Sequence, residues 1–293
     1  MSDFLDTFAG QADRDVVVAA TKAAARDVAD PKNTILWGQA PRGIALNKVK
    51  RLTLFDGVGA QKALPANFDQ FTNLVSLAVP LHLVAQLPGT LSTHLRTLIV
   101  LAGRAPSAAL PKGLLLPKLE TLLASEVKVS FDPAQVPGLR NLAVQAPKPK
   151  DLETVVELTK LEGLKLGPIP DAKIFKLVAK HPLRRLFLLR GGLPKLQGIE
   201  TLPMLTHFGA KGMVKLADVR ALDGLPLLGD LDFQFCPAVG DVSFLAKKKS
   251  LKKVRFWGCT DRKNTIRKAI PLLRAAKIEI DSDLDDEDED DDD

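Results

Sequence analysis

The chain has 293 residues, of which 46% are hydrophobic and 26% charged, and this balance argues against a disordered or fibrous protein. No run approaches 18 consecutive apolar residues, and two cysteines cannot build a disulfide framework, so we expect a cytoplasmic protein without a transmembrane helix. The formal net charge is +6, and aromatic residues make up only 5%, so the core must be mainly aliphatic.

Residues 1–48 are expected to cover the start of the fold. Apolar residues between Asp13 and Ala29 recur at helical spacing, and Pro31 ends the pattern. We therefore predict an N-terminal capping helix in this segment. The apolar stretch 34–37 predicts an edge strand that precedes the first repeat.

One pattern recurs from Val49 to Ile280. An apolar residue is followed by two variable residues, a second apolar residue, one variable residue and a third apolar residue, as in Leu95-Arg-Thr-Leu98-Ile-Val100. The alternation that ends each copy predicts a short strand with one buried face, and stacked copies would bury these faces against one another. The copies begin at Val49, Leu74, Leu95, Leu119, Leu139, Leu161, Leu183, Leu205, Leu228, Leu251 and, in degenerate form, Ala275.

This pattern resembles the leucine-rich repeat over residues 49–280. The resemblance implies an α/β solenoid, or horseshoe, whose concave side is a parallel sheet of about eleven strands. Proline in the early connecting segments predicts extended or 3₁₀ returns on the convex side. Longer apolar spacing in 174–178 and 266–273 predicts short α-helices there.

The repeats are followed by an acidic tail, residues 281–293. Only Ser282 and Leu284 are not acidic, so the tail holds 11 of the 35 acidic residues and leaves 24 against 41 basic residues in the body. Such a run of like charges predicts disorder. The tail would increase solubility, cover the basic cluster 247–253 in competition with anionic ligands, or bind a basic partner.

Outward positions of the repeat are the candidate binding site. With the first apolar residue as position 1, positions 1, 4 and 6 point into the core, and positions 3, 5 and 7 point away from it. Apolar groups gathered on such a face usually mark an interaction surface, and basic groups would select an acidic partner and speed its encounter. We predict apolar anchors at Phe55, Ile99, Leu101, Leu123, Phe187, Leu189 and Trp257. We predict charged contacts at Arg51, Lys165, Arg185, Lys211, Lys253 and Arg255.

Catalytic and metal-binding patterns are weak. Cys236 and Cys259 both occupy position 9, which in leucine-rich repeats often holds Asn or Cys that satisfies loop backbone groups, so we expect a structural role. Two cysteines without nearby histidine do not make a metal site. None of the four histidines lies near a nucleophile in a motif, and no glycine-rich nucleotide-binding motif is present. We therefore expect no enzyme, no cofactor and no metal.

The sequence thus predicts a non-enzymatic binding or scaffold protein that recognises a protein partner on the concave face. A first alternative is a nucleic-acid-binding protein that uses the basic body, with the acidic tail competing for the same surface. A second alternative is an inhibitor or immunity-type protein that blocks a toxin or an enzyme.

Overall fold

The computed structural model describes residues 34–36, 45–55, 63–91, 94–101, 106–124, 127–145, 152–169, 171–259 and 265–284; for 34–36 and Phe55 this covers the backbone. The predicted capping helix and residues 285–293 lie outside these ranges. The chain divides into two compact units, unit 1 (residues 1–145) and unit 2 (residues 146–293).

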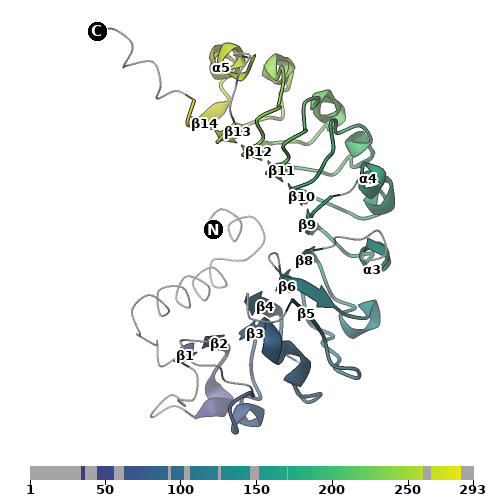
Figure 1. Cartoon of the computed structure of the whole chain (residues 1–293), viewed down its shortest axis with the longest axis vertical. Helices are drawn as coiled ribbons and strands as arrows, with labels where there is room; N and C mark the ends of the chain where they lie inside the picture. The colour runs from purple at the N-terminus through teal and green to yellow at the C-terminus, as the bar shows by residue number, and fades with distance from the viewer. Residues whose placement is uncertain are drawn as a thin grey trace, which may run out of the picture. The chain divides into compact units, whose positions relative to one another are not determined.

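Unit 1 contains a parallel sheet with one strand from each of its repeats, preceded by the predicted edge strand (Figure 1). Each repeat strand begins at position 3, because the residues before it belong to the turn that enters the sheet. The strands, in spatial order, are β1 (Thr34–Leu36), β2 (Arg51–Phe55), β3 (Ser76–Pro80), β4 (Thr97–Leu101), β6 (Thr121–Ala124) and β8 (Asn141–Gln145).

The returns of unit 1 are short 3₁₀ segments, as the prolines predict. These segments are η1 (Leu46–Lys48), η2 (Phe68–Gln70), η3 (Leu81–Gln86) and η4 (Pro133–Gln135). Two further strands, β5 (Ser107–Ala109) and β7 (Lys128–Ser130), form a separate parallel pair that the sequence does not predict.

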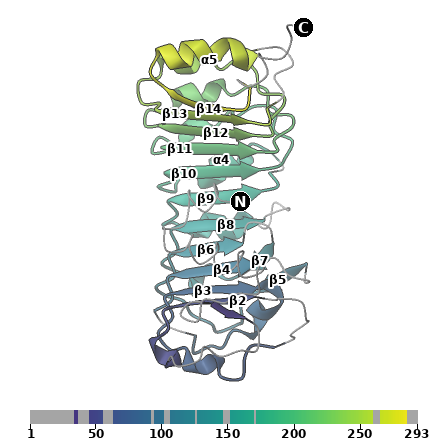
Figure 2. The ribbon, with the colours of Figure 1, turned by 90° about the vertical axis from the view of Figure 1, so that its left-hand side faces the viewer.

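Unit 2 repeats the arrangement with regular parallel strands (Figure 2). They are β9 (Gly163–Gly167), β10 (Arg185–Leu189), β11 (His207–Lys211), β12 (Asp230–Gln234), β13 (Lys253–Trp257) and β14 (Glu279–Ser282). Its returns are α3 (Glu153–Glu157), α4 (Lys173–Val178), η6 (Ile199–Thr201), η7 (Arg220–Gly224), η8 (Ser243–Lys247) and α5 (Thr265–Ala275). Helices α4 and α5 confirm the two helices predicted from apolar spacing.

The core lies between the sheet and the returns and is filled by positions 1, 4 and 6 of successive repeats. Phe208, Phe233 and Phe256 stack through unit 2 with ring centroids 6.3 Å and 5.8 Å apart, and all three are at most 2% exposed. Helix α5 contacts β14 and η8. Its buried side chains are those of Ile266, Ala269, Ile270 and Leu273. Burial of such aliphatic and aromatic area is the main stabilising contribution to the fold.

The last strand differs from the sequence prediction in register. Lys253 pairs with Glu279 and Arg255 with Asp281, so β14 is displaced by two residues from the alignment of its degenerate copy. A shift of two residues keeps every side chain on the same face, so apolar alternation alone does not distinguish the two registers. Asp281 and Ser282 belong to β14 and Leu284 is 9% exposed, so the first four residues of the predicted disordered tail are part of the fold.

Candidate partner-binding surface

Positions 3, 5 and 7 of the strands form one side of each sheet, which we call the sheet face. In unit 1 this face carries two predicted anchors, Ile99 and Leu123, which are only 4% and 3% exposed. The strand register makes them direct neighbours and places Ala78 and Ala143 on either side. This continuous apolar row leaves almost no accessible area, so the expectation that Ile99 and Leu123 are exposed anchors is wrong.

The other predicted residues of unit 1 have different surroundings. Leu101 and Arg51 are partly exposed at opposite ends of their strands. Phe55 ends β2, and its side chain lies outside the described part of the structure. The structure therefore does not gather the unit 1 anchors into one accessible cluster among the described residues.

Phe187 and Lys165 of unit 2 are buried on the sheet face rather than in the core. The ring of Phe187 lies across Gly209 of the next strand, where any Cβ would overlap it. Lys165, on the preceding strand, places its Nζ 5.2 Å from the ring centroid. Both residues are 6% exposed as a result, so the sequence assigned the correct face but not the accessibility of these two side chains.

The predicted cations of β13 already have carboxylate partners within the chain. Lys253 Nζ lies 2.6 Å from Glu279, and Arg255 lies 2.9 Å from Asp281 and 3.6 Å from Asp232. Burial acts to raise the pKa of Asp281, but hydrogen bonds from Trp257 and Arg255 and the nearby positive charges outweigh it and keep the pKa below its usual value. These ion pairs reduce the charge that Lys253 and Arg255 present to a partner.

The predicted cation of β10 is affected by burial. Desolvation lowers the pKa of Arg185, and the negative charge of Glu162 opposes this effect. Arg185 is partly exposed on the sheet face and pairs in register with His207 of β11. It thus remains near the surface, with an acidic group of its own chain close by.

The exposed aromatic side chains among the described residues of unit 2 lie where the strands end. Trp257, at position 7, is 46% exposed, and Phe235, at position 8, is 56% exposed. The two residues are joined by a backbone hydrogen bond from Phe235 N to Trp257 O of 2.7 Å. Lys211 extends over the Phe235 ring with its Nζ 5.7 Å from the centroid, a distance at which a cation is attracted to an aromatic face.

Position 8 has a left-handed backbone in four successive repeats. Gly212 and Gly258 have φ of 66° and 59°, whereas Arg190 and Phe235 adopt φ of 52° with a side chain present. A bulky residue in this conformation carries backbone strain, and strained residues concentrate at functional sites. Gly258 leaves room for the neighbouring Phe235 ring, because a Cβ there would lie 2.5 Å from Phe235 Cδ1.

We call Leu189, Lys211, Phe235 and Trp257 the aromatic ledge. Leu189 is partly exposed and pairs in register with Lys211, while Trp257 pairs with Gln234, the residue before Phe235. The indole is oriented by its Nε1, which donates to Asp281 Oδ1 at 3.0 Å. Three of these four residues were predicted from the sequence.

The repeat pattern does not predict Phe235, because it assigns only positions 3, 5 and 7 to the outward face. The available signal was the glycine at the same position in the copies on either side, Gly212 and Gly258. Glycine at a fixed place after a strand indicates a left-handed turn. A phenylalanine in that place is therefore a departure from the local pattern.

Both cysteines have the structural role that the sequence predicts. They are free thiols in the core, and Cys236 Sγ donates to the carbonyls of Ala210 and Gln234, each at 3.4 Å. Cys259 Sγ donates to the carbonyls of Phe233 and Trp257, at 3.5 Å and 3.7 Å. Burial raises the pKa of Cys236 to about 12 and that of Cys259 to about 11, so both thiols stay protonated and unreactive at neutral pH.

Metal-binding clusters and membrane-spanning helices are both absent from the described ranges. No group of three or more His, Cys, Asp or Glu side chains there is arranged to hold a metal ion. No helix in that part of the chain has the length and apolar character needed to cross a membrane.

The chain matches no family model and no curated protein sequence. Among solved structures it is similar to the leucine-rich-repeat ectodomain of the receptor kinase GASSHO1/SCHENGEN3 from Arabidopsis thaliana, solved in complex with CASPARIAN STRIP INTEGRITY FACTOR 2. The identity is 15%, the TM-score is 0.39, and the match covers 71% of this chain but only 30% of the ectodomain.

Two further structures match along most of their length. The leucine-rich-repeat domain of the type III effector XopL is 19% identical with a TM-score of 0.33, and the match covers 94% of this chain and 82% of that domain. Internalin C2 of Listeria monocytogenes is 13% identical with a TM-score of 0.32, and 95% of each chain is covered. Each copy of the repeat forms one strand of a parallel sheet, and on this evidence the chain is a leucine-rich-repeat solenoid.

Proposed function

We propose that the chain is a non-enzymatic binding protein that recognises a protein partner through the aromatic ledge. The observation that carries this proposal is the exposure of Phe235 and Trp257 on neighbouring strands, with Phe235 in a strained backbone conformation. Tryptophan is among the residue types that most often dominate the binding energy of protein interfaces, and phenylalanine is enriched at their cores. Both side chains have few rotatable bonds, so binding would order them at little entropic cost.

The partner is proposed to present an apolar side chain to the two rings and an acidic group to Lys211. Leu189 extends the apolar area along the same row. Lys211 and the exposed Arg190 supply positive charge next to it. The sequence predicts a preference for an acidic partner, and we assign this preference to Lys211 and Arg190. Lys253 and Arg255 are already paired with carboxylates of their own chain.

A capture experiment with matched variants tests this proposal. The wild-type protein is used as bait, its strongest bound protein is identified and purified, and the affinity is then measured directly. Replacement of Phe235 and Trp257 with Ala is expected to weaken binding by at least about 30-fold, since truncation of one central aromatic residue costs about 2 kcal/mol.

Leu227→Ala is the control, because Leu227 is an equally exposed apolar residue of unit 2, at 52%, that lies outside the ledge. We expect the control to bind like the wild type. Equal affinity of the double variant and the wild type, with both folded, would show that the partner binds elsewhere.

A further inference from the structure

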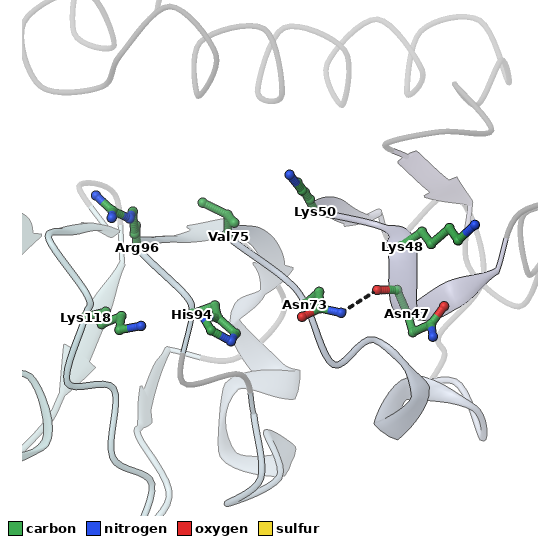
Figure 3. Close-up of a pocket in the computed structure, with 8 residues that line it drawn as sticks. All are labelled: Asn47, Lys48, Lys50, Asn73, Val75, His94, Arg96 and Lys118. Carbon is green, nitrogen blue, oxygen red and sulfur yellow. Dashed lines mark hydrogen bonds between the residues drawn. The ribbon is translucent and has the colours of Figure 1, made fainter.

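A basic hollow of about 520 Å³ lies in unit 1, where the chain enters strands β2, β3, β4 and β6 (Figure 3). Among the described residues that line it, none is acidic. The basic and imidazole side chains of this lining are those of Lys48, Lys50, His94, Arg96 and Lys118.

The repeat register explains why these side chains meet. Lys48, His94 and Lys118 all occupy the position just before the first apolar residue of their repeats, and Lys50 and Arg96 both occupy position 2. Equivalent positions on adjacent parallel strands are about 4.8 Å apart. From Lys48 to Lys118 is three strand steps, so the backbone positions of these cations span about 14 Å.

The hollow has cations on both sides and amide groups between them. Figure 3 shows His94, Arg96 and Lys118 on one side and Lys48 and Lys50 on the other. Asn73 lies between the two groups and is held in place, because its Nδ2 donates to the carbonyl of Asn47 at 2.7 Å. The four Lys and Arg side chains are exposed, so they reach solvent and any anion that enters.

One carboxylate lies just outside the lining. Glu120 accepts from Arg96 Nη1 at 3.0 Å. The side chains of both residues are about half exposed, at 58% and 45%, and such surface pairs contribute little and exchange readily. The pair uses one guanidinium nitrogen and holds Arg96 at the rim of the hollow.

This concentration of charge is not a general property of the repeats. In unit 2 the position before the first apolar residue holds Lys160, Pro182, Met204, Leu227 and Ser250. Position 2 there holds Glu162, Arg184, Thr206, Gly229 and Lys252. Over the four copies around the hollow the two rows hold four Lys or Arg side chains and one acid, Glu120, whereas over the five copies named in unit 2 they hold three Lys or Arg and one acid. The cations are therefore denser around the hollow.

We propose that the hollow binds a ligand that carries several phosphate groups. Lysine and arginine form strong charge-assisted hydrogen bonds with phosphate oxygens, and side-chain amides add neutral donors. The span of about 14 Å exceeds what a single phosphate can contact, so a ligand with phosphates at several places uses the cations best. This site is separate from the aromatic ledge and does not depend on the proposed protein partner.

The experiment uses inorganic tripolyphosphate as the probe and titration calorimetry on the full chain. Lys50→Gln, Arg96→Gln and Lys118→Gln are combined in one variant. The matched control combines Lys252→Gln, Arg184→Gln and Lys160→Gln, which removes the same charges from the same repeat positions in unit 2. All six residues are exposed, so both variants are expected to fold, which thermal unfolding checks.

We expect tripolyphosphate to bind more tightly than orthophosphate, and the first variant to bind it about tenfold more weakly while the control is unchanged. Equal weakening of both variants, or no binding by the wild type, would overturn the proposal. Binding of RNA that is lost in the first variant, without binding of tripolyphosphate, would also overturn it and indicate a nucleic-acid site instead.

A second arm identifies the source of the phosphates. Phosphatidylcholine vesicles with and without 5% phosphatidylinositol bisphosphate are sedimented with each protein. Cosedimentation that requires the phosphoinositide and is lost in the first variant supports a lipid headgroup. Binding of tripolyphosphate without cosedimentation supports a free phosphorylated ligand.

Discussion

At the scale of single residues, the neighbours across the sheet decide how much of an outward-facing side chain is exposed. Phe187 points away from the core, as position 5 should, yet its exposure depends on Gly209 and Lys165, each 22 residues away in the sequence. A sequence pattern gives the direction of a side chain, whereas its exposure depends on the size of its neighbours across the sheet. Trp257 is 46% exposed, and the strand pairing of β13 with β14 ends one residue before it.

Phe235 provides a test of strain at a binding surface. Replacement with Gly and replacement with Ala both remove the ring, but only Gly adopts the left-handed backbone without steric cost. With φ at 52°, we expect the Gly variant to be about 1 kcal/mol more stable than the Ala variant in urea unfolding. Both should lose affinity for the partner to the same extent.

Gly212→Ala is the reciprocal control for this prediction. Its φ of 66° is similar, and a Cβ at Gly212 would make only an ordinary contact with Arg190 Cγ at 3.5 Å. We therefore expect Gly212→Ala to lose about 1 kcal/mol through its backbone conformation alone. Equal stability of the Gly and Ala variants at position 235 would contradict the assignment of strain.

At the scale of elements, strands were easier to predict than the segments that connect them. Each copy of the repeat forms one strand because its alternation fits a sheet with one buried face. The pair β5 and β7 escaped prediction because both strands lie in connecting segments outside the repeat pattern, although Val127, Val129 and Phe131 alternate with polar residues around β7. The register of β14 escaped because the turn after α5, where Lys277 has φ of 63°, determines where the strand begins.

Gln135 is a buried polar side chain that joins two returns of unit 1. It ends η4, is 8% exposed, and its Nε2 donates to the carbonyls of Pro111 at 2.8 Å and Leu114 at 3.0 Å. Its Oε1 accepts from Asp132 N at 2.9 Å, which completes a capping box. A single side chain thus satisfies three backbone groups.

We expect Gln135→Ala to lower the free energy of unfolding by about 2–3 kcal/mol, because these backbone groups are left without a partner in a buried place. Urea unfolding followed by circular dichroism measures this change. Gln70→Ala is the control, since Gln70 is exposed at the same end of η2, and a loss below about 0.5 kcal/mol is expected. A comparable loss in the two variants would remove the special role given to Gln135.

At the scale of the whole molecule, the repeat period was sufficient to predict the architecture. In a solenoid each repeat contacts mainly its neighbours, so a local pattern repeated many times determines the global fold. Charge was less informative, because the sequence shows only a basic body. The register shows in addition that cations gather where the chain enters β2–β6, and that the cations of β13 are paired with carboxylates of β14. Net charge describes the molecule, while a binding site depends on where the charges meet.

The two buried thiols make the stability of the folded chain sensitive to high pH. Folding raises the pKa of Cys236 to about 12 and of Cys259 to about 11, both above the ordinary value of 9.0. Above pH 9 the unfolded chain releases these protons while the folded chain keeps them, so the unfolded state is favoured. This contribution to stability is complete below pH 9 and is lost progressively as the pH rises toward the folded-state values.

The variant Cys236→Ala with Cys259→Ala isolates this contribution from other groups that titrate at alkaline pH. We expect it to be less stable than the wild type at pH 7, because two buried side chains are shortened. Between pH 9 and pH 11, however, its free energy of unfolding should fall less steeply with pH than that of the wild type. Urea unfolding at intervals of half a pH unit gives both slopes, and parallel slopes would show that the thiols titrate alike in the folded and unfolded chain.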